Sequence, residues 1–237
     1  MKITPRRLEN FFNHSIERLV QARVFPKYIH AACDTTFSET TDQYEGCGSV
    51  FRERKVKARG YRKAGELKAV KVWLYGWKVW AIYEVQTGIP IAIKIDTIEK
   101  PDNLHVLEVL EQAKQNVKQT SVIRSLVVDR GFLDGKSLYA IDQQGIEFVI
   151  PLKSNMEATR DARALALEVS PSTETREVTV THGYGKNTWD EKVLTTLVGI
   201  PGLMSCDWFN PEGSEANTAK KDYEPIPLNA VVVKTWN

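Results

Sequence analysis

Two apolar runs in this 237-residue chain each end directly on an aspartate. The segment "YIHAACDTTF" (residues 28–37) leads into Asp34, and the segment "SLVVDRGF" (residues 125–132) leads into Asp129. Runs of this kind predict strands that are buried on both faces. In open α/β sheets, ligands bind at the carboxyl ends of the strands. The sequence therefore predicts an α/β fold in which Asp34 and Asp129 meet at one edge of a sheet and share one site.

The spacing of apolar, turn and capping residues predicts the other elements. In the first half these are an amphipathic helix at 5–23, the strand ending at Asp34, a basic loop, a β-hairpin at 69–85 and 89–98, and a helix that opens at Pro101 with Asp102 as its cap. After the strand ending at Asp129 come a helix capped by Asp134, a strand at 146–152, a helix at 157–168, a β-ribbon around Gly183 and Gly185, and a strand at 229–236. This order predicts a mixed α/β sheet with an antiparallel meander and a parallel half.

The predicted elements divide the chain into four regions. Residues 1–27 are predicted to be an N-terminal helical segment, and residues 28–153 are predicted to be the core. Residues 154–226 are predicted to be an insertion that is partly β-rich, and residues 227–237 are predicted to be the last strand of the core sheet. A chain of this length fits one large domain that holds an insertion.

Positive charge is concentrated between residues 52 and 71. Nine Lys and Arg residues against two Glu residues give this segment a net charge of +7, whereas the whole chain carries +2 and the remainder therefore −5. A localised basic segment is typical of a surface that binds a polyanion. A solvated loop has the same composition, so the charge pattern alone leaves both interpretations open. The aromatic residues at 73–83 are interpreted as sheet packing rather than as a surface for stacked bases.

Composition argues against several classes of protein. The cysteines Cys33, Cys47 and Cys206 have no CxxC spacing and the four histidines are dispersed, which argues against a disulfide framework and a zinc site. No window approaches the roughly eighteen uninterrupted apolar residues of a membrane span, and the first residues lack the apolar core of a signal peptide. The sequence therefore predicts a cytoplasmic protein with no membrane segment.

A shared aspartate site requires a compensating positive charge. Two carboxylates about 4 Å apart repel each other by roughly 4 kcal/mol at an effective dielectric constant near 20. Mg²⁺ binds a few carboxylate oxygens together with water and phosphate oxygens, and a pair of such ions can activate a nucleophile and stabilise a leaving oxygen in phosphoryl transfer. An aspartate at a strand end is also common as a cap or turn residue, so spacing alone leaves both roles open.

The ordered segments "ACDTTF", "GWKVWAIYEVQTGIPIAIKI" and "VVDRGF" resemble the core of a DDE transposase of the bacterial insertion-sequence type. In that family, the first strand ends with the first Asp, a Gly-aromatic-Lys hairpin with a Thr-Gly turn follows, and the fourth strand ends in Asp-Arg/Lys-Gly-aromatic. The matching positions are Asp34, Gly76 to Lys78, Thr87 to Gly88, and Asp129 to Phe132. The resemblance covers roughly residues 28–153. It implies a ribonuclease H-like mixed sheet that is flanked by helices and carries a β-rich insertion.

The resemblance also implies roles for individual residues. Asp34 and Asp129 would be catalytic and would hold Mg²⁺ or Mn²⁺, so that water and later a DNA 3′-hydroxyl attack a phosphodiester. The implied partner is DNA, both transposon ends and target, in the bacterial cytoplasm and associated with the nucleoid; a homodimer is left open. Arg130 is assigned either to DNA or to bracing of its loop, and Gly131 is expected to permit the turn. The residues expected to contact DNA are Arg52, Arg54, Lys55, Lys57, Arg59, Arg62, Lys63, Arg130 and Lys153.

The end of the chain departs from the family pattern. The third acid of the family is a Glu on a helix after the last core strand, and this sequence stops at Asn237, where that helix should begin. The other acids near the end lie before the last predicted strand and receive no transferred role: Glu191, Glu212, Glu215 and Glu224. We therefore expect a truncated chain that binds DNA and is inactive alone.

Two alternatives belong to other classes of protein. A phosphatase of the haloacid dehalogenase type also ends its first strand on a nucleophilic Asp, but it requires a second Asp two residues later, where this chain has Thr36. A non-catalytic DNA-binding remnant would use the basic segment alone. Metal-dependent DNA cleavage separates the transposase from the remnant, and a phospho-aspartate trapped at Asp34 would favour the phosphatase.

Overall fold

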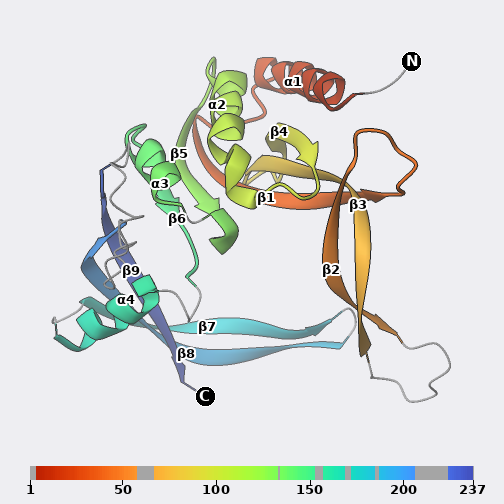
Figure 1. Cartoon of the computed structure of the whole chain (residues 1–237). Helices are drawn as coiled ribbons and strands as arrows, with labels where there is room; N and C mark the ends of the chain where they lie inside the picture. The colour runs from red at the N-terminus through yellow and green to blue at the C-terminus, as the bar shows by residue number, and fades with distance from the viewer. Residues whose placement is uncertain are drawn as a thin grey trace, which may run out of the picture. The chain divides into compact units, whose positions relative to one another are not determined.

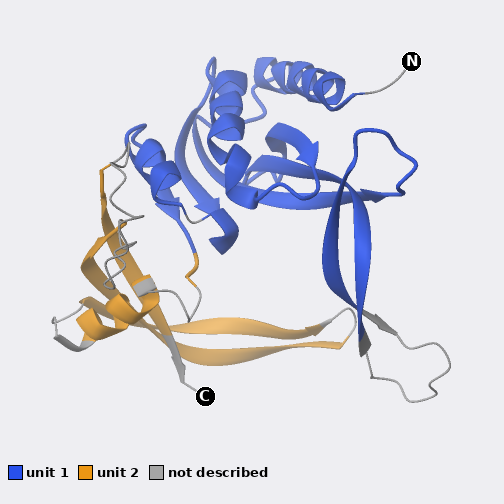
Figure 2. Ribbon diagram, in the orientation of Figure 1, with its two compact units in different colours: residues 1–150 blue, residues 151–237 orange. Residues whose placement is uncertain are grey.

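The computed structural model describes residues 4–57, 67–132, 134–152, 157–168, 172–184, 187–205 and 224–236. The chain separates into two compact units, residues 1–150 and residues 151–237 (Figure 2). The division falls close to residue 153, where the sequence predicts the end of the core. The N-terminal helix belongs to the first unit.

The described residues of the first unit form a six-stranded mixed sheet (Figure 1). Its strands are β1 (Tyr28–Thr40), β2 (Gly48–Lys57), β3 (Leu67–Glu84), β4 (Pro90–Thr97), β5 (Val122–Val128) and β6 (Glu147–Val149). The strand order is β2-β3-β1-β5-β6, and β4 pairs with β3. The pairs β1/β5 and β5/β6 are parallel, while β3 pairs antiparallel with β1, β2 and β4. The predicted mixed α/β sheet is therefore confirmed.

Helices of the first unit pack on the sheet through one apolar core. They are α1 (Pro5–Gln21), the 3₁₀ turn η1 (Asp102–His105), α2 (Val106–Val117), the 3₁₀ turn η2 (Arg130–Phe132) and α3 (Gly135–Asp142). Ile16 of α1 and Leu110 of α2 are buried in one cluster with Ile29 of β1, Ile82 of β3 and Leu126 of β5. The apolar residues of α1 and α2 recur at helical spacing, so each helix has one apolar side, and that side packs on the sheet.

Burial along β1 and β5 alternates, which corrects the prediction of strands buried on both faces. On β1, Ile29 and Cys33 are buried whereas Asp34 is exposed. On β5, Val128 is buried whereas its neighbour Val127 is 43 % exposed. Successive side chains of a strand point to opposite faces, so the uninterrupted apolar letters concealed a one-sided strand.

Two predicted boundaries change in the structure. Asp134 caps α3 as predicted, since its carboxylate accepts a hydrogen bond from the Ser137 N–H at 3.2 Å. Asp102 does not cap α2, because α2 begins only at Val106 and the Asp102 side chain is engaged elsewhere. The strand predicted at 146–152 is limited to β6.

The predicted basic loop contains a strand. Residues Gly48 to Lys57 form β2, which pairs with the first half of β3 from Leu67 to Gly76. These paired segments form a two-stranded ribbon, which we call the β2–β3 arm (Figure 1). The sequence predicts a loop for the segment "SVFRERKVK" because the four consecutive charged residues at 52–55 interrupt its β-forming residues and leave no alternation of apolar and polar side chains. Arg59, Arg62 and Lys63 lie outside the described residues.

The second unit combines one helix with a three-stranded antiparallel sheet in the order β7-β8-β9. Its elements are α4 (Glu157–Glu168), β7 (Ser172–Tyr184), β8 (Asn187–Met204) and β9 (Pro227–Trp236). The helix at 157–168 and the β-ribbon are confirmed. The prediction that residues 227–237 return to the core sheet is wrong, because β9 pairs with β8 from Leu194 to Met204. Val232 of β9 packs against a separate small core that contains Ala162 of α4, which explains where this strand buries its apolar side.

None of the helices in the described ranges is both long enough and apolar enough to span a membrane.

Candidate functional site

The register of β1 and β5 brings the two predicted aspartates to the same end of neighbouring strands. The last paired residues of this parallel ladder are Cys33 and Val128, and the next residues along the chain are Asp34 and Asp129. Adjacent strands lie about 4.8 Å apart. Both side chains are exposed, and each carboxylate accepts a 2.7 Å hydrogen bond from the N–H of the following residue, Thr35 or Arg130.

The two strands reach this edge in different ways. β5 ends at Val128 and the chain turns into η2. β1 continues to Thr40, and Asp34 pairs with Ala81 of β3. The prediction that a strand stops at each aspartate is therefore correct only for Asp129. Asp34 lies where its parallel neighbour ends, which leaves its carboxylate open on that side.

Cys33 precedes Asp34 but is unsuited to chemistry. Its side chain is buried, and burial raises the pKa of the thiol to about 12, with the negative charge of Asp34 adding to the effect. A thiol at this pKa is neutral at physiological pH, and the thiolate is the form that acts as nucleophile or metal ligand. Cys33 therefore contributes packing beneath the aspartate edge.

An ion pair between a buried lysine and a half-buried aspartate, which the sequence did not reveal, lies next to this edge. Lys78 of β3 has a side chain only 4 % exposed, and its ammonium lies 2.8 Å from the Asp102 Oδ1, with the Asp102 side chain 37 % exposed. The ammonium also donates to the Lys100 carbonyl. The Trp80 indole N–H donates to the Asp102 carbonyl oxygen at 2.6 Å. A lysine in the middle of an otherwise apolar strand was the available signal, since Lys is seldom buried unless paired.

Asp102 contacts the chain beside both predicted aspartates. The Thr35 hydroxyl donates to its Oδ1 at 3.2 Å, and Thr35 is the residue after Asp34. A Cβ placed on Gly131 would lie 2.9 Å from its Oδ2, and Gly131 follows Asp129 by two residues. Gly131 lies in the turn η2, but its φ is not in the left-handed region, so the turn does not use the conformational freedom of glycine; a Cβ there would instead crowd the Asp102 carboxylate.

The β2–β3 arm joins the rest of the sheet at Gly76 of β3. This residue is paired both with Gly48 of β2 and with Glu39 of β1, and it has a φ of 155°. A Cβ at Gly76 would lie 2.1 Å from the Ser38 carbonyl oxygen, which explains why only glycine fits. The glycine of the Gly-aromatic-Lys motif is thus required by contact between two backbones.

Two arginines of the arm contact side chains near the end of β1. The Arg52 guanidinium lies 4.3 Å from the centre of the Phe37 ring, an arrangement typical of a cation–π contact. The Arg54 guanidinium forms two hydrogen bonds to the Glu39 carboxylate, of 3.2 Å and 3.3 Å. Arg54 of the basic segment therefore has an acidic partner outside that segment.

The aromatic residues of β3 divide into two groups. Trp80 is fully buried, which confirms the interpretation of sheet packing for this residue. Trp73 is 58 % exposed and forms a tilted pair with Phe51, which is 52 % exposed, at a centroid distance of 5.2 Å. The arm therefore presents two exposed rings on the face that alternates with Arg52 and Arg54.

The remaining sequence-based candidates are dispersed. Arg130 is exposed, and Lys55 and Lys57 lie within β2. The His105 ring lies 2.7 Å from the Asp96 carboxylate and 2.8 Å from that of Glu108, so both of its nitrogens have partners within the first unit. The Glu191 carboxylate is 2.8 Å from the His182 ring, Glu224 is exposed, and Lys153, Glu212 and Glu215 lie outside the described residues.

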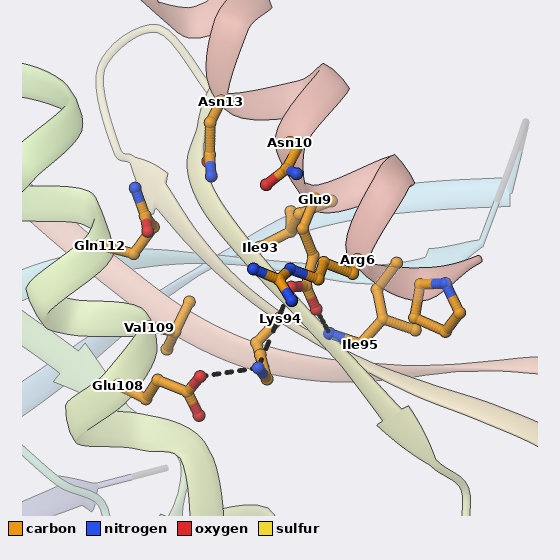
Figure 3. Close-up of a pocket in the computed structure, with 11 residues that line it drawn as sticks. Arg6, Glu9, Asn10, Asn13, Ile93, Lys94, Ile95, Glu108, Val109 and Gln112 are labelled. Carbon is orange, nitrogen blue, oxygen red and sulfur yellow. Dashed lines mark hydrogen bonds and ion pairs between the residues drawn. The ribbon is translucent and has the colours of Figure 1, made fainter. Parts of the chain in front are cut away.

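The described residues contain a cavity of about 450 Å³ elsewhere in the first unit, between α1, β4 and α2 (Figure 3). Lys94 lies there, 2.6 Å from the Glu108 carboxylate and 3.9 Å from that of Glu9. Burial alone would lower the pKa of Lys94, but the bond to Glu108 and the charge of Glu9 outweigh it and raise the pKa. The lining includes neither Asp34 nor Asp129, so this cavity is separate from the aspartate edge.

Comparison with known proteins identifies the family. A family model described as "Transposase DDE domain" matches residues 26–198. The chain belongs to this family. The match begins just before β1, contains both aspartates and extends into β8 of the second unit. No curated protein matches the chain. The mixed sheet with its flanking helices is consistent with the ribonuclease H-like fold of a transposase domain.

Membership in the DDE family implies a divalent metal, and the donor chemistry at the aspartate edge fits one. Asp34 and Asp129 supply exposed carboxylate oxygens, the ligands that Mg²⁺ and Mn²⁺ prefer. Within the described ranges, no group of three or more His, Cys, Asp or Glu side chains is arranged to hold an ion. Among the described residues the edge offers two exposed carboxylates, and an ion held there would take its other ligands from water and phosphate oxygens.

Proposed function

We propose that this chain provides the catalytic domain of a DNA transposase that cleaves DNA and transfers strands at the ends of an insertion sequence. The observation that supports this most directly is the parallel register of β1 and β5, in which Asp34 and Asp129 follow the last paired residues. Family membership supports the same function. The phosphatase alternative loses its support, since Thr36 stands where that family needs its second Asp.

In this proposal Asp34 and Asp129 together hold Mg²⁺ or Mn²⁺. When bound, the ion supplies activation of a water or a 3′-hydroxyl and stabilisation of charge on the phosphodiester. The chain's own contribution is to fix the two carboxylates on adjacent strands before an ion arrives. Two carboxylates about 4 Å apart repel by roughly 4 kcal/mol at an effective dielectric constant near 20, and a cation offsets this repulsion. We assign the third carboxylate of the family to no residue of this chain.

We further propose that the β2–β3 arm binds DNA through phosphates. Arg52 and Arg54 are exposed cations on one face of β2. An Arg that stacks on a ring keeps its N–H donors available to phosphate oxygens, as for Arg52 on Phe37. The other residues proposed for DNA contact are Lys55, Lys57, Arg59, Arg62, Lys63, Arg130 and Lys153. Transposon ends and target DNA would be the partners, in the bacterial cytoplasm near the nucleoid.

The metal proposal is tested by isothermal titration of Mn²⁺ into the parent chain, Asp34→Asn and Asp129→Asn. We expect each substitution to weaken binding at least about tenfold, because each removes one of two charged protein ligands. Asp134→Asn is the matched control, since Asn caps a helix as well as Asp does and Asp134 serves as a cap. Parent-like binding by both single variants would refute the shared site.

DNA binding and cleavage are tested separately. If about five phosphates are neutralised, the affinity should fall with a log–log salt slope of roughly −4 to −5. Replacing Arg52, Arg54, Lys55 and Lys57 by Ala should flatten that slope, and an unchanged slope would exclude the arm from binding. Metal-dependent cleavage of insertion-sequence ends that is lost on Asp34→Ala would support catalysis. DNA binding without any binding of Mn²⁺ would favour the DNA-binding remnant.

A further inference from the structure

We propose that Lys78 and Asp102 form a positioning pair that sets the relation between Asp34 and Asp129. This inference rests on the proposed metal site, because its consequence is the geometry of those two carboxylates. Neither residue is assigned a role by the sequence pattern beyond Lys78 closing the Gly-aromatic-Lys motif and Asp102 opening a helix. The structure gives Asp102 a different task from capping, since its side chain bonds to Lys78 and Thr35.

Asp102 is placed to link the two strands that bear the aspartates. One carboxylate oxygen accepts from the Thr35 hydroxyl at 3.2 Å, on the residue that follows Asp34 in β1. The other oxygen lies against Gly131 in η2, the turn that follows Asp129. Both Thr35 and Gly131 are therefore within contact of one carboxylate, and a shift of that carboxylate changes the support on both sides of the aspartate edge.

Lys78 fixes this carboxylate. The ammonium donates to the Asp102 Oδ1 and to the Lys100 carbonyl, and it lies 5.4 Å from the Phe37 ring centre and 5.5 Å from that of Trp80. The Trp80 indole also holds the Asp102 backbone carbonyl. Asp102 is thus constrained through its side chain and through its backbone. A residue that positions metal ligands must itself be held in place by several contacts, and Asp102 meets this requirement.

Stability alone does not account for such a pair. Removing a lysine from water is costly, and a well-packed apolar pair of similar size is often as stable as a buried ion pair or more so. The Lys78 side chain is 4 % exposed, so the lysine loses most of its contact with water, whereas the Asp102 side chain is 37 % exposed. The ion pair supplies two features that an apolar pair would lack. One Asp102 oxygen accepts the hydrogen bond from Thr35, and the other is held next to Gly131.

Three substitutions probe the pair from different sides. Asp102→Asn keeps the shape but weakens the bond to Lys78. Thr35→Val leaves the ion pair intact and removes only the hydroxyl that reaches it. Gly131→Ala adds a Cβ 2.9 Å from the Asp102 Oδ2 and displaces that oxygen, at a glycine whose φ an alanine tolerates. Thr35→Val and Gly131→Ala are small changes, so they keep the test valid if Asp102→Asn does not fold.

The matched control is Glu108→Gln. Glu108 also pairs with a partly buried lysine of the same unit, Lys94, at 2.6 Å, but it lies at the cavity between α1, β4 and α2. It has no contact with the chain beside either aspartate among the bonds that the described residues show. Loss of a carboxylate in that place controls for general effects of breaking a lysine pair.

The experiment measures Mn²⁺ affinity by isothermal titration of the full chain, with the midpoint of thermal unfolding recorded for each variant. We expect Asp102→Asn to weaken Mn²⁺ binding about tenfold or more, and Thr35→Val and Gly131→Ala to weaken it by smaller factors in the same direction. Glu108→Gln should bind Mn²⁺ as the parent does. A role in stability alone would lower the unfolding midpoints and leave the affinity of the folded protein unchanged.

Three results would overturn the inference, and each is distinguishable from the others. Parent-like affinity in Asp102→Asn and in Thr35→Val and Gly131→Ala would refute positioning while the metal site stands. Complete loss of binding in Asp102→Asn, with no effect of Thr35→Val or Gly131→Ala, would make Asp102 a direct ligand instead. Absence of Mn²⁺ binding in the parent chain would refute the metal site and the positioning role together.

Discussion

Replacing Glu39 by Gln should strengthen DNA binding. The Arg54 guanidinium is held by two hydrogen bonds to the Glu39 carboxylate, so DNA phosphate must compete with this internal partner. The Arg54 side chain is 55 % exposed and that of Glu39 is 42 % exposed. Ion pairs this exposed contribute about 0.2–1 kcal/mol to stability. Releasing that energy corresponds to a gain in affinity of about 1.4- to 5-fold. One additional free cation should also steepen the log–log salt slope by up to about 0.9.

Fluorescence anisotropy of a labelled duplex, titrated at salt concentrations of about 50 to 200 mM, measures both quantities. Glu53→Gln is the matched control, because it makes the same change in net charge. Glu53 lies on β2, as Arg54 does, but on the alternate face of that strand. The gain for Glu39→Gln should exceed the gain for Glu53→Gln. Equal gains would show that only net charge matters, and a loss of affinity would show that the pair holds Arg54 in its DNA-binding position.

Two further predictions concern stability. Burial alone would raise the pKa of Glu84, but hydrogen bonds from Gln86 and Thr87 outweigh it and lower the pKa below its ordinary value of 4.5. Because the pKa of Glu84 is lower in the folded protein than in the unfolded chain, its carboxylate stabilises the fold at pH values above the unfolded pKa, and this stabilisation is lost as the pH falls through the folded pKa. Glu84→Gln should therefore lower the free energy of unfolding by about 1–3 kcal/mol at pH 7 and by less in acid. Urea unfolding at several pH values measures both effects. Gly76→Ala should lower the midpoint of thermal unfolding of the first unit by several degrees or prevent folding, because the added Cβ would lie 2.1 Å from the Ser38 carbonyl oxygen. Gly88→Ala is a milder control, since φ is 66° there but a Cβ would have open space. Equal effects of the two substitutions would contradict the steric argument.

The aspartate edge could be predicted because two strong local signals coincide there. Each run of apolar residues ends on a carboxylate, and the connection from β1 to β5 contains a helix, α2, which favours a parallel pair. The register that brings Cys33 opposite Val128 then follows from burying the apolar residues of both strands on one face. The resemblance to the family supplied the adjacency of the two strands, which no local pattern could establish.

The errors have a common physical origin in pairing between distant segments. β2 was missed because its charged side chains alternate with each other more than with apolar ones, and only pairing with β3 makes the segment a strand. β9 was assigned to the wrong sheet because its valines fit any apolar surface, and nothing in the sequence distinguishes the edge of β8 from the edge of the core. Asp102 was assigned to a cap because a cap is the local role of such a residue, whereas Lys78 lies 24 positions earlier in the chain.

Strand β3 connects these observations, because three of its residues make three different contacts that the fold requires. Gly76 lets the backbones of β1 and β3 approach where the β2–β3 arm begins. Lys78, two residues later on the same face, holds Asp102 beside the aspartate edge. Glu84 fixes the Thr-Gly turn that leads into β4, since its carboxylate accepts from the Thr87 N–H at 2.7 Å. A motif that looks like a loose sequence pattern is therefore a set of contacts with β1, with η1 and with its own turn, and each contact fails under a different substitution.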